Sequence, residues 1–150
     1  MGKYHQGFFI PKNPKKYIGD ASNIIYRSSW EFKFLMECDN NPDILEWSSE
    51  EIAIPYRSPL DKQIHHYFPD NFIKTKQING SIKKQIVEIK PHAQTLEPVK
   101  GKKKTKKYIR EVTTYLVNQA KWEAAKSWCA DRGYDFVILT EKQLFPKQPK

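Results

Sequence analysis

Two strand-like segments joined by Asn79-Gly80 restrict the fold of this chain more than any other feature. The segment after the turn ends at Pro91 and is rich in β-branched residues, namely Ile82, Ile86, Val87 and Ile89. This composition is typical of a β-strand, and Asn-Gly between two such runs is a strong hairpin signal. We therefore expect it to pair, antiparallel, with the segment that follows Pro69.

Charged side chains stand at the open end of this predicted hairpin. Glu88 and Lys90 are two residues apart, so they leave an extended strand on the same face, and Asp70 begins the partner segment. Two carboxylates that converge repel each other unless a cation lies between them. Mg²⁺ favours one or two carboxylates together with waters and phosphate oxygens. A lysine beside the ion can orient a water or steady the charge of a phosphate, so the pattern predicts a metal-dependent phosphodiesterase.

The register of the hairpin decides whether these groups meet. A two-residue turn would pair Asn71 with Glu88 and direct Asp70 to the opposite face of the sheet. A three-residue turn with Gly80 in the left-handed conformation, or a β-bulge near Pro69, would bring Asp70 to Glu88. We predict that one of these two devices is present.

Pro69-Asp70 followed by Glu88-Ile89-Lys90 resembles the signature of the PD-(D/E)XK nucleases, the restriction-endonuclease-like superfamily. The order of predicted elements around it is similar to the αβββαβ core of that superfamily. Tyr-Arg-Ser-Ser-Trp-Glu at 26–31 and Phe-Val-Ile-Leu-Thr-Glu at 136–141 resemble the TnsA-like branch. The whole chain, including Lys-Tyr-Ile-Gly-Asp at 16–20, is similar to head completion proteins of T-even-type tailed phages.

The resemblance implies a single α/β domain of restriction-endonuclease type with a mixed central sheet. It implies hydrolysis of DNA phosphodiester bonds with Mg²⁺ or Mn²⁺, the ion being held by Asp70, Glu88 and the backbone carbonyl of Ile89. Lys90 would position or deprotonate the attacking water, or stabilise the pentacovalent phosphate. The implied setting is the virion, and the host cytoplasm during assembly, where the protein would trim or secure packaged DNA ends before tail attachment. A capsid, portal or neck protein is the implied partner.

Glu31 has two interpretations. Ser28-x-x-Glu31 fits a capping box, in which Glu31 reaches back to the helix start and does no chemistry. Glu31 also shares a helical face with Phe34 and Leu35, and a carboxylate on a buried face needs a partner such as a metal or its bound water. The acidic residue of this first helix often joins the metal site in the superfamily, so we expect Glu31 to assist catalysis. Arg27 is expected to hold a DNA phosphate or a neighbouring acid.

The chain is long enough for one domain, which we place at residues 26–143. Residues 1–25 are interpreted as an arm in which lysines alternate with aromatic residues. The aromatic side chains would either stack on bases or dock the arm onto the domain. Residues 144–150 are interpreted as a frayed tail.

The remaining elements follow from periodicity. Residues 44–47 are predicted to form a short strand or turn, 52–56 the first long strand, and 63–67 the strand that leads to Pro69. A second helix is predicted over 107–131, ended by Gly133 and followed by a buried strand at 135–140. Its predicted core-facing stripe is Ile109, Val112, Leu116, Ala120, Ala124 and Trp128. Glu50 and Glu51 are expected to be merely solvated.

The chain carries 26 Lys and Arg against 17 Asp and Glu, a net charge of +9. Such an excess indicates a polyanionic partner, and double-stranded DNA is the first candidate. Six of the eight residues from 100 to 107 are lysine, and we expect them, with Arg27, to hold the DNA backbone without reading sequence. These lysines are Lys100, Lys102, Lys103, Lys104, Lys106 and Lys107.

His66, Gln119 and Lys121 are accessory candidates for the site. A zinc site is not indicated, because His65 and His66 face opposite sides of a strand and have no third ligand at a suitable spacing. Cys38 and Cys129 are expected to be reduced core residues. No apolar run approaches the roughly 18 residues that a membrane helix needs.

The sequence also allows a different class of function. A structural virion protein could plug or clamp DNA with a nuclease fold whose chemistry is idle, and a nuclease that cleaves RNA or acts in transposition would differ in substrate. Monomer and dimer are both open.

Overall fold

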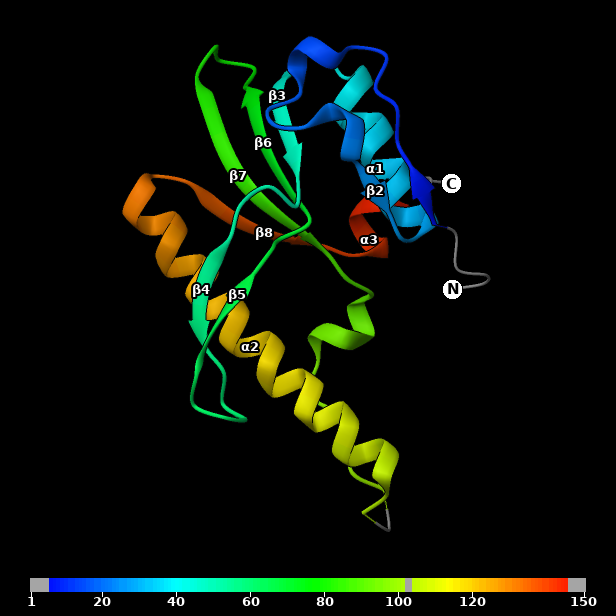
Figure 1. The fold of residues 1–150 in the computed structure, drawn as a ribbon, viewed down its shortest axis with the longest axis vertical. Helices are drawn as coiled ribbons and strands as arrows, with labels where there is room; N and C mark the ends of the chain where they lie inside the picture. The colour runs from blue at the N-terminus through cyan, green and yellow to red at the C-terminus, as the bar shows by residue number, and fades with distance from the viewer. Residues whose placement is uncertain (1–5, 102–103, 146–150) are drawn as a thin grey trace.

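The computed structural model describes residues 6–101 and 104–145, and a four-stranded mixed sheet lies at its centre (Figure 1). Along the sheet the strands are β3 (Ile44–Ser49), β6 (Asn71–Lys76), β7 (Ile82–Ile89) and β8 (Asp135–Leu139). The first three are antiparallel neighbours, whereas β8 runs parallel to β7. Helix α1 (Ser29–Asn40) precedes β3, and α2 (Lys106–Arg132) connects β7 to β8. The predicted αβββαβ core with a mixed sheet is confirmed.

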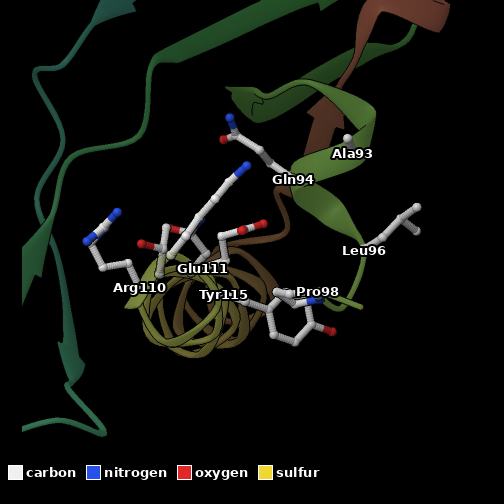
Figure 2. Close-up of a pocket in the computed structure, with 10 residues that line it drawn as sticks. Ala93, Gln94, Leu96, Pro98, Arg110, Glu111 and Tyr115 are labelled. Carbon is white, nitrogen blue, oxygen red and sulfur yellow. The ribbon is translucent and has the colours of Figure 1, made fainter. Parts of the chain in front are cut away.

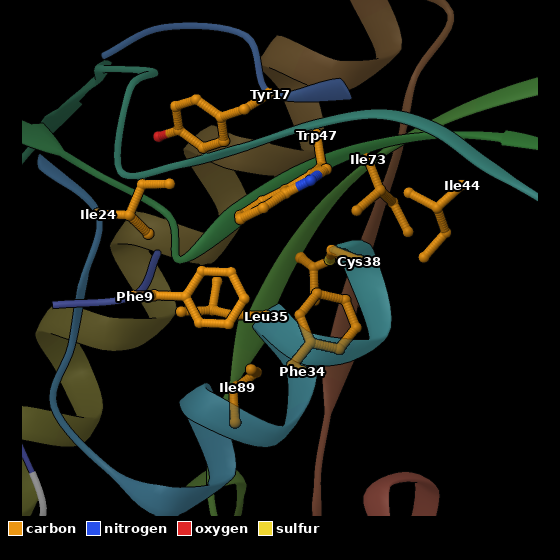
Figure 3. Close-up of a cluster of buried hydrophobic side chains, with 11 residues drawn as sticks. Phe9, Tyr17, Ile24, Phe34, Leu35, Cys38, Ile44, Trp47, Ile73 and Ile89 are labelled. Carbon is orange, nitrogen blue, oxygen red and sulfur yellow. The ribbon is translucent and has the colours of Figure 1, made fainter. Parts of the chain in front are cut away.

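Helix α1 begins where the sequence predicts it. The side chain of Ser28 accepts a hydrogen bond from the backbone N–H of Glu31 at 3.1 Å, which satisfies a donor that the first helical turn leaves free. The buried face of α1 carries Phe34, Leu35 and Cys38. These side chains pack in the main apolar cluster together with Trp47 of β3 (Figure 3). This packing covers one face of the sheet with α1.

The strand prediction for residues 52–56 is wrong in its placement. Strand β3 is the first strand of the sheet in chain order, while β4 (Ile54–Arg57) pairs, among the described residues, with β5 (Ile64–Tyr67) alone in a separate two-stranded ribbon. Ile54 and Tyr56 are buried against Trp122 and neighbouring residues of α2. Alternation of apolar and polar residues indicates that one face of a strand is buried, but it does not indicate which element covers that face.

The predicted stripe on α2 is wrong in its first half. Ile109 and Leu116 are 45% and 47% exposed, and the buried residues of the helix are Asn118, Trp122, Ala125 and Cys129. The reason is that only the second half of α2 lies against the sheet and the ribbon, while the first half extends past them (Figure 1). Gly133 ends the helix in the left-handed conformation, with φ of 71°, as predicted.

The segment before α1 packs on the domain. Strands β1 (Gly7–Phe8) and β2 (Ile25–Tyr26) pair with each other, and Phe9 and Tyr17 are buried in the main cluster. Two 3₁₀ helices, η1 (Pro14–Lys16) and η2 (Ala21–Asn23), lie between these strands. Of the two roles considered for the aromatic residues here, Phe9 and Tyr17 have the docking role.

The end of the chain also differs from expectation. Among the described residues, strand β8 pairs only with β7 and is an edge strand, so its residues are half-buried or exposed instead of fully buried. A short helix α3 (Glu141–Leu144) follows it, and Leu144 packs against the main cluster, so the boundary expected at residue 144 falls inside this helix. Residues 1–5 of the predicted arm and 146–150 of the predicted tail lie outside the described residues. None of the helices in residues 6–101 and 104–145 has the length and apolar character needed to span a membrane.

Candidate active site

The hairpin turn between β6 and β7 contains three residues. The backbone N–H of Gln77 donates to the carbonyl of Ser81 at 2.8 Å, which leaves residues 78–80 as the loop. Gly80 has a φ of 86°, a left-handed conformation that costs a glycine little. The predicted three-residue turn with a left-handed Gly80 is confirmed.

This turn fixes the register at the far end of the hairpin. The last pair of the ladder is Asn71 with Val87, so Asp70 falls opposite Glu88. Asp70 no longer belongs to the ladder, and its Oδ2 accepts a hydrogen bond from the backbone N–H of Ile89 at 2.7 Å. The carboxylate of Asp70 is thereby held at the Glu88-Ile89-Lys90 segment.

Glu88 is buried and fixed from both sides. Its Oε1 accepts a hydrogen bond from the hydroxyl of Tyr67 at 2.7 Å, and its Oε2 lies 3.8 Å from Nζ of Lys90. The side chain of Glu88 is 8% exposed and that of Lys90 is 28% exposed. Lys90 therefore lies between the buried carboxylate and the surface, where a substrate can contact the lysine side chain.

Tyr67 was not anticipated from the sequence. It comes from β5 of the ribbon, and its contact with Glu88 depends on how the chain passes from the ribbon to the sheet at Pro69. No local pattern predicts that passage. The one available signal was chemical: a buried carboxylate requires hydrogen-bond donors, and a tyrosine three residues before Asp70 is one of the donors nearby in the chain.

The two carboxyl groups share an unfavourable electrostatic environment. Burial raises the pKa of Asp70 well above its usual range, and the nearby charges of Glu88 and Glu31 raise it further. The hydrogen bond from the Ile89 N–H and the charge of Lys90 lower this pKa but do not cancel the rise. Burial also raises the pKa of Glu88, although the Tyr67 hydroxyl and the charge of Lys90 oppose the shift. Because the local cations and donors do not fully compensate this negative charge, the pair would gain from a bound cation.

Glu31 makes the contacts expected of a helix cap and also lies near Asp70. Its carboxylate accepts hydrogen bonds from the backbone N–H of Arg27 at 3.3 Å and from the hydroxyl of Ser28 at 3.4 Å, so it does reach back to the helix start. Burial raises the pKa of Glu31, and its charge in turn raises that of Asp70. The helix start thus lies within electrostatic reach of the candidate site.

Arg27 holds a neighbouring acid. Its guanidinium donates to Oε1 of Glu50 at 2.6 Å. Glu50 itself has a φ of 54°, and its backbone N–H donates to the carbonyl of Asp70 at 3.2 Å. Glu51 accepts a hydrogen bond from the Tyr17 hydroxyl at 2.7 Å. The expectation that Glu50 and Glu51 are merely solvated is wrong, because both tie the segment after β3 to other parts of the domain.

The accessory candidates lie in different places. Lys121 of α2 has its Nζ 5.7 Å from the centre of the Tyr67 ring, and its charge lowers the pKa of Glu88, so the fold brings it to the site. His66 is exposed on β5, and the side chain of Gln119 makes no hydrogen bond within the described part of the chain. The two cysteines are buried and free, as expected.

The lysine run lies away from Asp70. Its described members are exposed, and Lys106 begins α2. At 1.5 Å per residue, Lys106 lies about 22 Å along the helix from Lys121. Lys102 and Lys103 are outside the described residues. The run therefore stands at the far end of α2, on the part that projects past the sheet (Figure 1).

The donors at the site suit a hard divalent cation. Within residues 6–101 and 104–145 no three His, Cys, Asp or Glu side chains are grouped closely enough to bind a metal by themselves, which does not match the four protein ligands of a structural zinc site. Mg²⁺ needs fewer, because it keeps several waters and takes one or two carboxylates. Asp70 and Glu88 supply two carboxylates, and Oδ1 of Asp70 makes no hydrogen bond with any described residue. The residues present fit such an ion.

Two comparisons with known proteins show what this chain is similar to. The family model described as TnsA-like endonuclease N terminal matches residues 41–141, a range that includes Asp70, Glu88 and Lys90 and begins after Glu31. The head completion nuclease of Enterobacteria phage T4 is 40% identical over 144 residues, and the match covers 93% of each chain.

Proposed function

Because this chain belongs to the TnsA-like endonuclease family, we propose that it is a metal-dependent endonuclease that hydrolyses DNA phosphodiester bonds during completion of a phage head. The observation that carries the proposal is the meeting of Asp70 with the Glu88-Ile89-Lys90 segment. The Oδ2 of Asp70 is 2.7 Å from the Ile89 nitrogen, and Nζ of Lys90 is 3.8 Å from Oε2 of Glu88.

Asp70, Glu88 and the backbone carbonyl of Ile89 would hold Mg²⁺ or Mn²⁺. The bound ion would supply Lewis acidity and lower the pKa of an attacking water. The hydrogen bond from Ile89 orients the Asp70 carboxylate, and the Tyr67 hydroxyl orients that of Glu88. Both carboxylates are thereby pre-positioned, which reduces the reorganisation needed when substrate binds.

Lys90 is the group placed to act on the substrate. Its side chain is partly exposed while its ammonium group faces Glu88, so it can orient the attacking water or stabilise charge on the phosphate. Glu31 acts through its charge on Asp70, and Lys121 acts through its charge on Glu88. Arg27, which is paired with Glu50, would support the segment next to Asp70.

The biological setting follows from the related protein. The relative from phage T4 is named a head completion nuclease, and we infer the same stage of assembly for this chain, with packaged DNA ends as substrate and a capsid, portal or neck protein as neighbour. The net charge of +9 suits a protein that binds the DNA backbone. The exposed lysines near the start of α2 would add contacts with the duplex at a distance from the cut.

The test is cleavage of supercoiled plasmid in Mg²⁺ by the parent protein and by Asp70→Asn and Lys90→Met. Each substitution should lower the cleavage rate at least about 100-fold, the scale of losing a general acid–base or electrostatic group. Lys74→Met is a matched control for the lysine, because Lys74 on β6 also pairs with a glutamate, Glu46, at 3.7 Å. Asp135→Asn is a matched control for the aspartate, because Asp135 is an exposed carboxylate paired with Lys83 at 3.6 Å.

Three outcomes are informative. Cleavage by the parent and both controls, with loss in the two site variants, supports the proposal. Equal loss in the control variants would mean that the effect is not specific to the site. Equal DNA binding by all proteins with cleavage by none would refute the enzyme and leave a protein that plugs or clamps DNA.

A further inference from the structure

A cavity of about 450 Å³ lies between α2 and the chain that leaves the candidate site (Figure 2). Each of its two walls has one end near that site. The helix η3 (His92–Thr95) begins two residues after Lys90, and it supplies Gln94 to one wall. On the other wall, Asn118 of α2 is three residues, or about 4.5 Å of helix rise, before Lys121. The cavity therefore extends along α2 from near the place where we propose that a DNA strand is cut toward the start of the helix.

Asn118 supplies the most informative polar group of this cavity. Its side chain is on the buried part of α2, with only 7% of the residue exposed, and it makes no hydrogen bond with the described residues. The amide is not one of the buried polar groups that are closed off from solvent, so it reaches water from the cavity wall. A carboxamide offers two donors and one acceptor. It can therefore bond a ligand that carries both donors and acceptors in place of water.

The charges around the cavity indicate where the phosphates of such a ligand would lie. Lys107 and Arg110 line the cavity and are exposed, and neither forms an ion pair within the described residues. In Figure 2, viewed along α2, Arg110 extends beside the helix and Gln94 lies on the η3 segment. Glu111 also lines the cavity, and its negative charge disfavours a phosphate inside. The cations are thus suited to phosphates at the rim, and the interior is suited to an uncharged polar group.

The other lining residues give the cavity an apolar, aromatic side. Leu96, Pro98 and Tyr115 contribute to it, and Figure 2 shows Tyr115 on the side of the helix where this loop runs. A nucleobase combines a flat apolar face with hydrogen-bonding edges, and bases stack well on aromatic side chains. The volume of the cavity lies within the range of about 300–1,000 Å³ typical of small-molecule sites.

We propose that this cavity receives one unpaired nucleotide of the DNA substrate, at an overhang or bulge a few nucleotides from the bond that is cut. The base stacks on Tyr115, its edge bonds to the amides of Asn118 and Gln94, and the flanking phosphates meet Lys107 and Arg110. The inference rests on the proposed nuclease function and specifies its substrate as DNA with an unpaired nucleotide. Such DNA arises at ends that are not fully base-paired.

The test compares the affinity of the full chain for two DNA duplexes in EDTA, so that no cleavage occurs. One duplex is fully paired, and the other has the same sequence with one unpaired 2-aminopurine nucleotide. We expect the second to bind about tenfold more tightly, the scale of one base stacked on an aromatic ring. The fluorescence of the 2-aminopurine should fall on binding, because stacking in the cavity quenches it.

Two variants and one control separate the site from general DNA binding. Asn118→Leu keeps the side-chain volume and removes the amide, and Arg110→Ala changes an exposed residue that is not needed for folding. Each should reduce the preference for the unpaired duplex to less than about threefold, because one of the contacts that distinguish it is lost. Lys126→Ala removes a cation elsewhere on α2, paired with Glu123 at 3.2 Å, and should leave the preference unchanged.

A parallel plasmid assay distinguishes the two proposals. If the parent protein cleaves plasmid but binds the two duplexes equally, or if Asn118→Leu and Arg110→Ala keep the full preference, the nucleotide site is wrong and the nuclease stands. If plasmid is not cleaved while the preference exists and depends on Asn118 and Arg110, the site stands and the nuclease function is wrong.

Discussion

Replacing Asp70 by Asn is expected to stabilise the metal-free fold while it abolishes cleavage. Asn has nearly the same shape as Asp. Its side-chain oxygen can still accept the hydrogen bond from the Ile89 N–H, which is 2.7 Å long in the parent protein. Its amide can donate to Glu88, whose charge is one of the groups that raise the pKa of Asp70. The substitution therefore removes a buried negative charge and replaces a repulsion by a hydrogen bond.

The size of the effect follows from linkage. Each unit by which folding raises the pKa of a carboxyl group costs about 1.4 kcal/mol of stability at a pH above both pKa values. The Ile89 N–H and the charge of Lys90 already offset part of this cost for Asp70. We expect Asp70→Asn to raise the free energy of unfolding by about 1–2 kcal/mol, as relief of a strained active site commonly does. For a chain of this size the melting temperature should rise by about 2–8 °C.

The assay is urea unfolding in EDTA at several pH values. The folded-state pKa of Asp70 lies above its unfolded-state value. Protonated Asp70 therefore adds to the free energy of unfolding at low pH, and this contribution is lost as pH rises through the folded-state pKa. The advantage of Asn should thus be largest at neutral pH and should vanish near the unfolded-state pKa of about 3.9. With Mg²⁺ at about 100 times its Kd, the free energy of unfolding of the parent protein should rise by about 2.7 kcal/mol. That of Asp70→Asn should rise little.

Asp135→Asn is the control for this experiment. Asp135 is an exposed carboxylate, so its replacement should change stability by no more than about 1 kcal/mol. If Asp70→Asn lowers the stability of the metal-free protein, or if its advantage grows on acidification, the charge of Asp70 is not the source of strain and our account of the site is wrong.

Three further outcomes are expected. Tyr67→Phe removes a hydrogen bond that lowers the pKa of Glu88. Cleavage at acidic pH should therefore fall about tenfold, and the acidic limb of the pH–rate profile should move to higher pH. An unchanged profile would contradict this role of Tyr67. Gly80→Ala places a side chain at φ of 86° and should cost about 1 kcal/mol in urea unfolding, whereas Gly101→Ala, where the added carbon meets no atom within 4 Å, should be nearly neutral. Lys106→Gln should reduce the slope of log affinity for DNA against log salt by about 1, and an equal slope would mean that this lysine contacts no phosphate.

The hairpin shows what can be predicted from residues that are close together in the chain. Asn79-Gly80 predicted the turn, and the need to bring Asp70 to Glu88 required either a three-residue turn or a β-bulge near Pro69. The structure has the three-residue turn, with Asn71 paired with Val87. This worked because register depends on turn geometry and on the two-residue period of a strand, both of which are local. The contact of Tyr67 with Glu88 depends on two strands in different sheets, and no local pattern contains it.

Helix α2 shows the opposite case. Its start, its end at Gly133 and its length were predictable from capping and periodicity. Its buried face was not, because Ile109 and Leu116 remain exposed where the helix extends past the sheet. An apolar stripe gives the side that a helix can bury, whereas the partner element decides how much of that side is covered.

The sequence by itself therefore determined the hairpin and its position, the two long helices, and the charged residues Asp70, Glu88 and Lys90, but not which segment forms the first strand of the sheet. These follow from backbone sterics, side-chain periodicity and the chemistry of single residues, which act over a few positions. Only the tertiary structure decided that Tyr67 and Lys121 support Glu88, that Arg27 pairs with Glu50, and where a cavity opens. Such contacts join segments far apart in the chain, and they form only when burial of the common core has fixed how the sheet, the ribbon and the two helices pack together.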